Sequence, residues 1–218
     1  MDVLRANTTP LSIQIGLTRL TGDLYVPSSS RGLVLFVHGS GSSRLSPRNR
    51  YVAEILYQSN ISSLLFDLLT PEEDLDYQNR FDISVLTDRL DKVYDWVQGQ
   101  YPERHRPIGL FGASTGAAAA LQVAAKRGQG IAAVVSRGGR PDLAGANFLS
   151  RVKSPTLLIV GGLDIQVLAL NQEAYDVLPC LKELRVVPGA THLFEEPGTL
   201  ELAAQYATDW FLTHFNVK

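Results

Sequence analysis

Pro107-Ile108-Gly109-Leu110-Phe111-Gly112-Ala113-Ser114-Thr115-Gly116 is the most informative segment of the chain. Its apolar first half predicts a buried strand, and the alanine-rich segment that follows predicts a helix from Gly116 to Lys126. A serine in the sharp turn between a strand and a helix projects its hydroxyl above the end of the strand. Glycines at 112 and 116 leave room for the neighbouring strand and helix. We therefore expect a nucleophile elbow centred on Ser114.

A serine nucleophile needs a base that removes its proton and an acid that orients the base. The apolar strand expected at Thr156–Val160 runs through two glycines and a leucine into Asp164, and the strand-like run Glu183–Val187 leads to His192. Since Ser114, the aspartate and the histidine each follow a strand, a parallel sheet brings them to one edge. The chain order Ser, Asp, His is that of the α/β-hydrolase fold and not that of the chymotrypsin or subtilisin type. The sequence therefore predicts a Ser-His-Asp triad.

A second carboxylate could take the role of the acid. Asp142 comes after the strand expected at Ile131–Val135, and some members of the fold carry the acid after that strand. We favour Asp164, because it follows its strand directly, whereas Asp142 is several residues removed and stands beside Arg140, with which it can pair.

Three other histidines are weaker candidates for the base. His38 precedes a glycine turn at a strand end, His105 stands in a charged loop, and His214 lies near the C-terminus. His192 is favoured because only this histidine follows a strand downstream of both the serine and the aspartate.

An oxyanion hole is expected where the buried strand Gly32–Val37 ends in the glycine- and serine-rich loop His38–Ser43. In this fold one backbone N–H comes from that loop and the other from the residue after the nucleophile, which is Thr115 here. Ser40 is our candidate in the loop, and the sequence leaves Gly41 open as the alternative.

From about residue 30 to its end, the chain resembles the dienelactone hydrolase family of the α/β-hydrolase superfamily. The motifs that carry the resemblance are His38–Gly41, Gly112–Gly116, Gly162–Asp164 and Gly189–His192. The resemblance implies Ser114 as nucleophile, His192 as base and Asp164 as orienting acid. Family members that open dienelactones use a cysteine nucleophile, whereas the single cysteine here, Cys180, stands far from the elbow and is expected to be a buried small side chain.

Composition excludes several classes of protein. A chain of 218 residues with 45% hydrophobic content fits one domain, 1–218, with a full core. A net charge of −2 gives no strongly basic face for nucleic acid or an anionic membrane. One cysteine allows no internal disulfide, and Met1–Arg5 lacks the features of a signal peptide, so we expect a cytoplasmic protein. We expect it to be a monomer or a homodimer. No metal-ligand spacing is present, and we expect no metal and no cofactor.

The rest of the chain alternates between strand and helix, as a doubly wound, mostly parallel sheet requires. An antiparallel pair is expected at the N-terminus, with residues 11–15 pairing with Asp23–Val26 through the region of Gly22. The other expected elements are a helix capped by Ser46 from Pro47 to about Ser59, a strand at Ile61–Phe66, a polar connection over Asp67–Asn79, an amphipathic helix carrying Ile83, Leu86, Leu90, Val93 and Val97, and a closing helix over about Thr199–Phe215.

No cap domain fits between the strand at Ile131–Val135 and Thr156. The site should be covered only by the short segments Arg44–Arg50, Leu68–Asn79 and Arg137–Phe148. An open cleft of this kind favours small or extended substrates.

Arginines near the predicted site suggest an acidic substrate. Arg44 follows the oxyanion loop, and Arg137 and Arg140 follow a strand at the expected edge, so these three are our candidate substrate-binding residues. Arg48 and Arg50 share the region, and any of the five could instead be surface charge balanced by nearby acidic residues.

Taken together, the residues predict a cofactor-free serine hydrolase of small ester or lactone substrates that works through an acyl-enzyme on Ser114. A thioesterase, a peptidase or a perhydrolase would carry the same triad, and a non-catalytic binding module could keep the same fold.

Overall fold

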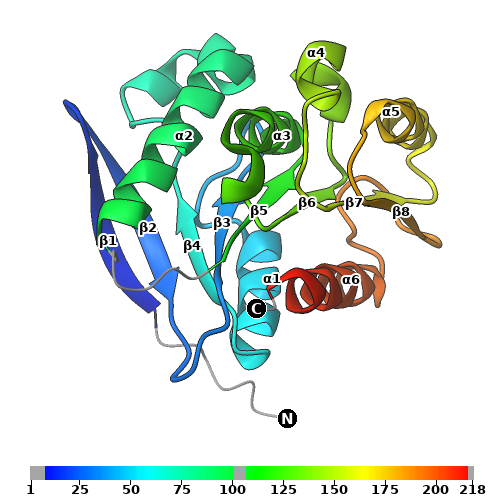
Figure 1. Cartoon of the computed structure of the whole chain (residues 1–218), viewed down its shortest axis with the longest axis horizontal. Coiled ribbons are helices and arrows are strands. Elements are labelled where there is room, and N and C mark those ends of the chain that lie inside the picture. The colour runs from blue at the N-terminus through cyan, green and yellow to red at the C-terminus, as the bar shows by residue number, and fades with distance from the viewer. Residues whose placement is uncertain (1–7, 101–106, 216–218) are drawn as a thin grey trace.

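The computed structural model describes residues 8–100 and 107–215 and shows an eight-stranded sheet with helices on both faces (Figure 1). The strands, in the order in which they lie across the sheet, are β1 (Thr8–Ile15), β2 (Thr18–Tyr25), β4 (Ser62–Phe66), β3 (Leu33–Val37), β5 (Ile108–Ala113), β6 (Ala133–Arg137), β7 (Thr156–Gly161) and β8 (Lys182–Val187). The helices are α1 (Pro47–Gln58), α2 (Ile83–Gln100), α3 (Thr115–Arg127), α4 (Ala146–Leu149), α5 (Ile165–Val177) and α6 (Thr199–His214).

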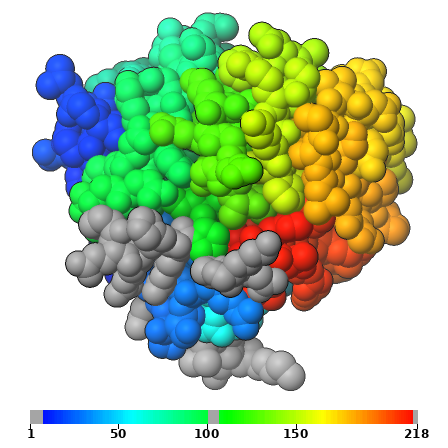
Figure 2. Space-filling view, in the orientation of Figure 1, coloured from blue at the N-terminus to red at the C-terminus, as the bar shows by residue number. Residues whose placement is uncertain are grey.

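The sheet is parallel from β4 to β8, and β1 and β2 form the expected antiparallel pair at one edge. The doubly wound, mostly parallel α/β-hydrolase architecture predicted from the sequence is confirmed. In the space-filling view (Figure 2) the colours run from blue over β1 and β2 through green to yellow and orange over α5 and β8, which follows the order of the strands.

The register of the antiparallel pair differs from the prediction. Ile15 pairs with Thr18 and Leu11 with Gly22, so the chain reverses at Gly16 and not near Gly22. Gly16 has φ +60°, which the tight turn requires and a glycine adopts without strain. Gly22 lies within the strand, where a Cβ atom would come 3.0 Å from the Cδ1 atom of Ile13. The sequence did not distinguish these two uses of glycine.

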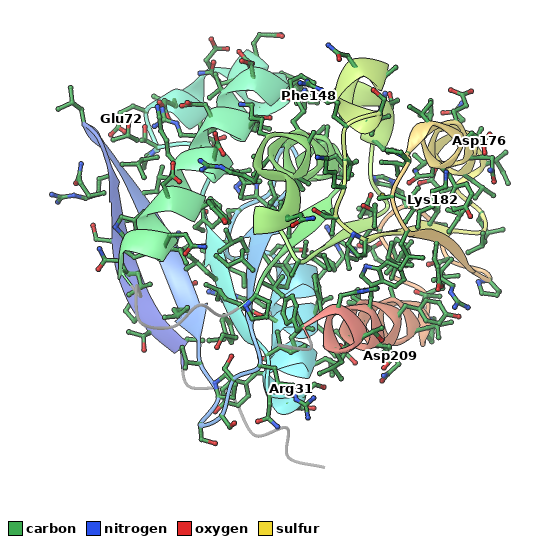
Figure 3. The ribbon with its side chains drawn as sticks, in the orientation of Figure 1. Arg31, Glu72, Phe148, Asp176, Lys182 and Asp209 are labelled. Carbon is green, nitrogen blue, oxygen red and sulfur yellow. The ribbon has the colours of Figure 1, made fainter. Side chains whose placement is uncertain are left out.

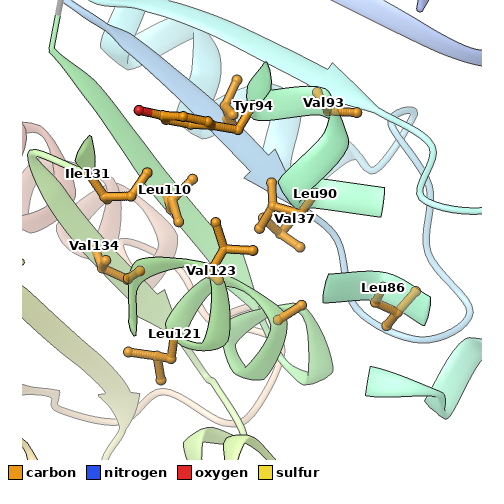
Figure 4. Close-up of a cluster of buried hydrophobic side chains, with 14 of the residues drawn as sticks. Val37, Leu86, Leu90, Val93, Tyr94, Leu110, Leu121, Val123, Ile131 and Val134 are labelled. Carbon is orange, nitrogen blue, oxygen red and sulfur yellow. The ribbon is translucent and has the colours of Figure 1, made fainter. Parts of the chain in front are cut away.

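Two hydrophobic cores fill the space on the two sides of the sheet. The helices α2, α3, α4 and α5 cover one face, and α1 and α6 cover the other (Figure 1). Figure 4 shows part of the first core, where Leu90 of α2, Val37 of β3 and Val123 of α3 lie together. The second core contains Phe36 of β3 and Phe111 of β5, with ring centroids 4.7 Å apart, and Phe211 of α6. Exposed charged side chains such as Glu72, Asp176 and Asp209 lie at the outside of the molecule (Figure 3).

Local signals set most helix boundaries. The Ser46 side chain accepts a hydrogen bond from the backbone N–H of Asn49, and Pro47 is the first residue of α1, as predicted. No helix was predicted at the position of α5, whose buried face consists of Val167, Asn171 and Ala174. Because a polar residue lies at the centre of that face and apolar residues are exposed elsewhere on the helix, the sequence shows only a weak helical periodicity of apolar residues.

The fold contains no inserted cap among the described residues, because the segment between β6 and β7 holds only a 3₁₀ turn (Pro141–Ala144) and the single turn of α4. The part of the chain that the structure describes also has no helix long and apolar enough to span a membrane. The segment 1–7, on which the absence of a signal peptide was judged, lies outside the described residues.

Candidate active site

Ser114 lies in the sharp turn between β5 and α3, with φ 50° and ψ −124°. Such a conformation costs a non-glycine residue of order 1–3 kcal/mol, so the surrounding structure must hold it in place. The two flanking glycines make the turn possible. A Cβ atom at position 112 would come 2.5 Å from the Cα atom of Ala117, and one on Gly116 would come 2.2 Å from the carbonyl oxygen of Val37. The turn therefore has the geometry of a nucleophile elbow.

Hydrogen bonds to the end of β6 hold the elbow. The backbone N–H of Ser114 donates to the carbonyl oxygen of Arg137 at 3.3 Å, and the N–H of Arg140 donates to the carbonyl oxygen of Ser114 at 3.0 Å. The strained turn is thereby fixed on both sides, and its position depends on the residues that follow β6.

Asp164 and His192 form a direct contact at the same edge of the sheet. The Nδ1 atom of His192 lies 2.7 Å from the Oδ2 atom of Asp164. An ionised carboxylate only accepts hydrogen bonds, so Nδ1 carries the proton and the lone pair of Nε2 is free. The aspartate side chain is 15% exposed and the histidine side chain 38% exposed, so the carboxylate is the more buried partner.

The loops that carry these two residues are joined to each other. The N–H of Leu163 donates to the carbonyl oxygen of Ala190 at 2.9 Å, which connects the aspartate loop after β7 with the histidine loop after β8. Within the histidine loop, the backbone N–H and the hydroxyl of Thr191 both donate to the carboxylate of Glu196, at 3.0 and 2.6 Å. Phe194, with φ 57°, turns its ring into the core. These contacts stabilise the loop that carries His192.

Ser114 and His192 line one cavity of about 240 Å³. The other residues around it are Gly39, Ser40, Ser42, Ser46, Arg48, Asn49, Ala113, Arg137, Gly138 and Leu193. Within the described residues, no hydrogen bond joins the Ser114 hydroxyl to the imidazole. Catalytic hydrogen bonds often form or shorten only when substrate binds, so a serine–histidine pair does not require this bond in the free protein.

One of the two expected oxyanion donors, the backbone N–H of Ser40, is bound to the side chain of Thr115. The backbone N–H of Ser40 donates to the Oγ1 atom of Thr115 at 2.8 Å. In this conformation the N–H is therefore occupied, whereas the prediction from the sequence requires it to be free for the oxyanion. The N–H of Thr115, at the first position of α3, has no acceptor among the described residues. Sequence could not show this bond, because it joins residues that the fold alone brings together.

His38 has a structural role that was not predicted from the sequence. Its Nε2 atom accepts a hydrogen bond from the backbone N–H of Leu68 at 3.1 Å, and its Nδ1 atom lies 3.0 Å from the carbonyl oxygen of Gly39. These partners require a neutral ring protonated on Nδ1. Burial lowers the pKa of His38, which keeps the ring neutral. The residue fixes the oxyanion loop to the segment after β4.

The three candidate arginines differ in their partners. Arg44 pairs with Asp67 at 2.6 Å, and Arg140 pairs with Asp142 through two bonds of 2.8 and 2.7 Å. Neither arginine lines the cavity of the serine. Arg137 does line it and is the one on which the substrate-binding hypothesis now rests. The pairing of Asp142 also leaves Asp164 as the carboxylate in contact with the histidine.

The remaining candidates have other surroundings. Cys180 lies 3.6 Å from the hydroxyl of Thr156, and burial raises the pKa of its thiol. The ring of His214 packs against Trp210. His105 lies outside the described residues. Among the residues that are described, no group of three or more His, Cys, Asp or Glu side chains could hold a metal ion.

Comparison with solved structures identifies the family. A crystal structure of a dienelactone hydrolase from Anabaena variabilis superimposes with a TM-score of 0.93 and 49% sequence identity, over 97% of this chain and 100% of that one. This chain belongs to the dienelactone hydrolase family. The esterase Est1E from Butyrivibrio proteoclasticus shares the fold, with a TM-score of 0.78 and 16% identity over 94% of this chain and 98% of that one.

Among curated proteins, the chain is 56% identical over 204 residues to a protein of Mycobacterium tuberculosis named "Putative phosphoribosyl transferase". The match covers 94% of this chain but only 46% of that protein, so this dienelactone hydrolase family member spans about half the length of the curated relatives it matches. No family model matches the chain.

Proposed function

We propose that this chain hydrolyses carboxylic esters, including lactones, through an acyl-enzyme on Ser114. The observation that carries the proposal is the 2.7 Å contact between His192 and Asp164 at the cavity that the elbow serine also lines. Membership of a hydrolase family supports the same reaction class. The transferase name of the Mycobacterium tuberculosis relative describes a protein of which the chain matches less than half, so we do not propose that activity here.

In the proposed reaction, the Nε2 atom of His192 takes the proton of the Ser114 hydroxyl as the oxygen attacks the substrate carbonyl. The imidazolium then gives this proton to the leaving alcohol, and the acyl group stays on the serine. A water molecule, activated by the same nitrogen, releases the acid and restores the serine. Asp164 keeps the proton on Nδ1 and stabilises the imidazolium in both steps.

The oxyanion needs donors at the moment when negative charge develops on the carbonyl oxygen. The N–H of Thr115 has no competing acceptor within the described chain. The N–H of Ser40 can contribute once it releases the Thr115 hydroxyl, which is a neutral acceptor and therefore a weaker one than an oxyanion. We propose that the substrate takes over this bond.

The test is a comparison of wild-type protein with Ser114→Ala on 4-nitrophenyl acetate, the corresponding thioester and the corresponding anilide. Loss of the nucleophile should lower kcat by roughly 10³ or more, because only binding and oxyanion contributions remain. Turnover of the ester above that of the thioester and anilide supports the esterase assignment over a thioesterase or peptidase. Wild-type protein that turns over none of the three, or Ser114→Ala that retains full turnover, contradicts the proposal.

Partner and location stay proposals as well. We propose a small-molecule ester as the only partner that the site requires, and the cytoplasm as the location, on the grounds of a single cysteine and a nearly neutral charge.

A further inference from the structure

We infer that the open edge of β8 is an interface with a second copy of this chain. The two β8 strands would pair antiparallel and join the two sheets into one. Of the two oligomeric states expected from the sequence, this is the homodimer. The inference concerns the edge of the sheet and does not depend on the proposed reaction.

The first observation is a strand edge with unpaired backbone groups. β8 is the last strand of the sheet and pairs with β7 alone (Figure 1). The N–H of Thr156 donates to the carbonyl oxygen of Leu181, and the parallel register continues from there. The N–H and C=O groups of Lys182, Leu184 and Val186 therefore point away from β7, and they bond to no described residue. Such a row of donors and acceptors is a template for another strand.

The second observation is that this edge lacks the usual protection against pairing. Exposed edges are commonly blocked by a proline or by lysine side chains that point outward. β1, at the other edge, contains Pro10, whereas β8 has no proline. The ammonium group of Lys182 is turned onto its own chain, where it donates to two carbonyl oxygens at the end of α5. Apolar side chains stay exposed along the edge, Val186 at 41% and Leu181 at 63%. β8 is therefore the edge that can accept a further strand.

The third observation is that the charges of β8 complement themselves in one register. In an antiparallel pair, residues whose backbone groups point outward lie opposite one another. With Leu184 opposite the Leu184 of the second copy, Glu183 of each chain lies opposite Arg185 of the other. A shift of two residues places either the two Glu183 side chains or the two Arg185 side chains opposite each other, and like charges there are destabilising. Charge therefore selects a symmetric register, as a two-fold interface requires.

The side chains of this register can reach a second copy. Within one chain, the Nη2 atom of Arg185 lies 2.7 Å from the Oε2 atom of Glu183, and side-chain exposures of 53% and 41% leave both open to solvent. A surface pair of this kind contributes little, so its partners can be exchanged with those of another chain. On the opposite face of the strand, Leu184 packs against the core on the α5 side, and the Leu184 of the second copy would extend that core.

This arrangement would leave both active sites open. The strands of one copy run opposite to those of the other, so the carboxyl ends of the two sets of strands lie at opposite ends of the joined sheet. Ser114 and His192 both follow such ends. Each cavity therefore keeps its own access to substrate.

Charge reversals, measured by sedimentation equilibrium, test the interface. Wild-type protein should sediment as two chains at micromolar concentrations. Glu183→Arg brings like charges opposite Arg185, and Arg185→Glu does the same opposite Glu183. Because two attractive contacts become repulsive, each variant should raise the Kd of the dimer about tenfold or more. Asp88→Arg is the matched control, since it reverses an exposed charge on α2, and it should leave the Kd within about twofold of the wild type.

Mixing the two variants separates the interface from damaged folding. Glu183→Arg chains carry only positive charge at the two positions and Arg185→Glu chains only negative charge, so the mixture should form a heterodimer tighter than either homodimer. A chain with both substitutions should regain the wild-type Kd, because its charges are complementary again. Circular dichroism melts check that every variant is folded.

Three results would overturn the inference. One is a wild-type protein that sediments as a single chain up to about 100 μM. Another is a dimer whose Kd neither single reversal changes, which would place the interface elsewhere. The third is a mixture of the two variants that associates no more tightly than its components.

Discussion

Replacement of Asp164 by asparagine tests the part of the site that decides the proton's position. The carboxylate lies 2.7 Å from Nδ1 of His192 and is largely buried, so no water replaces it easily. An amide can present its N–H to Nδ1, which moves the imidazole proton to Nε2, where the proton of Ser114 should be received. With the wrong tautomer, we expect kcat to fall by about 10³ to 10⁴, equivalent to about 4–5.5 kcal/mol of transition-state stabilisation.

Asp142→Asn is the matched control, because this carboxylate binds Arg140 and not the histidine. Both variants are assayed with 4-nitrophenyl acetate, and circular dichroism checks that each is folded. We expect Asp142→Asn to keep kcat within about threefold of the wild type, since it touches no reacting group. If Asp142→Asn instead loses the larger share of the activity, the orienting acid is Asp142, after β6, and not Asp164.

Two further predictions concern the oxyanion loop. Thr115→Val removes the acceptor of the Ser40 N–H, so the free energy of unfolding should fall by about 1 kcal/mol in urea titrations while kcat is unchanged or slightly higher; a kcat more than tenfold lower would show that the hydroxyl itself takes part. His38 has a pKa below its ordinary 6.5 in the folded state, so the unfolded chain binds more protons and stability should fall as pH drops below about 6.5. His38→Gln should flatten this dependence between pH 7.5 and 5.5, and equal slopes in both proteins would contradict the structural role.

The sequence predicted the features that depend on neighbouring residues. The elbow at Ser114 was readable because the strand, the two glycines and the helix follow each other directly. Asp164 and His192 were readable because each comes shortly after an apolar strand, and parallel strands bring such positions to one edge of the sheet. The cap of α1 at Ser46 is a similar local signal.

Features that depend on partners far away in the chain could not be read. The position of Arg137 at the cavity is visible only when β6, α1 and the histidine loop are placed around it. In sequence, Arg44 and Arg140 looked equally suitable, and only the structure shows their aspartates. The bond between Ser40 and Thr115 likewise joins two loops that sequence spacing does not relate.

Covalent labelling can identify the nucleophile of this protein. After incubation with a fluorophosphonate probe, peptide mass spectrometry should find the adduct on Ser114, with one probe per chain, and Ser114→Ala should not be labelled. His192→Ala should be labelled much more slowly, since the hydroxyl then lacks its base. An unlabelled wild-type protein, or an adduct at another residue that persists in Ser114→Ala, would contradict the assignment of Ser114 as the nucleophile.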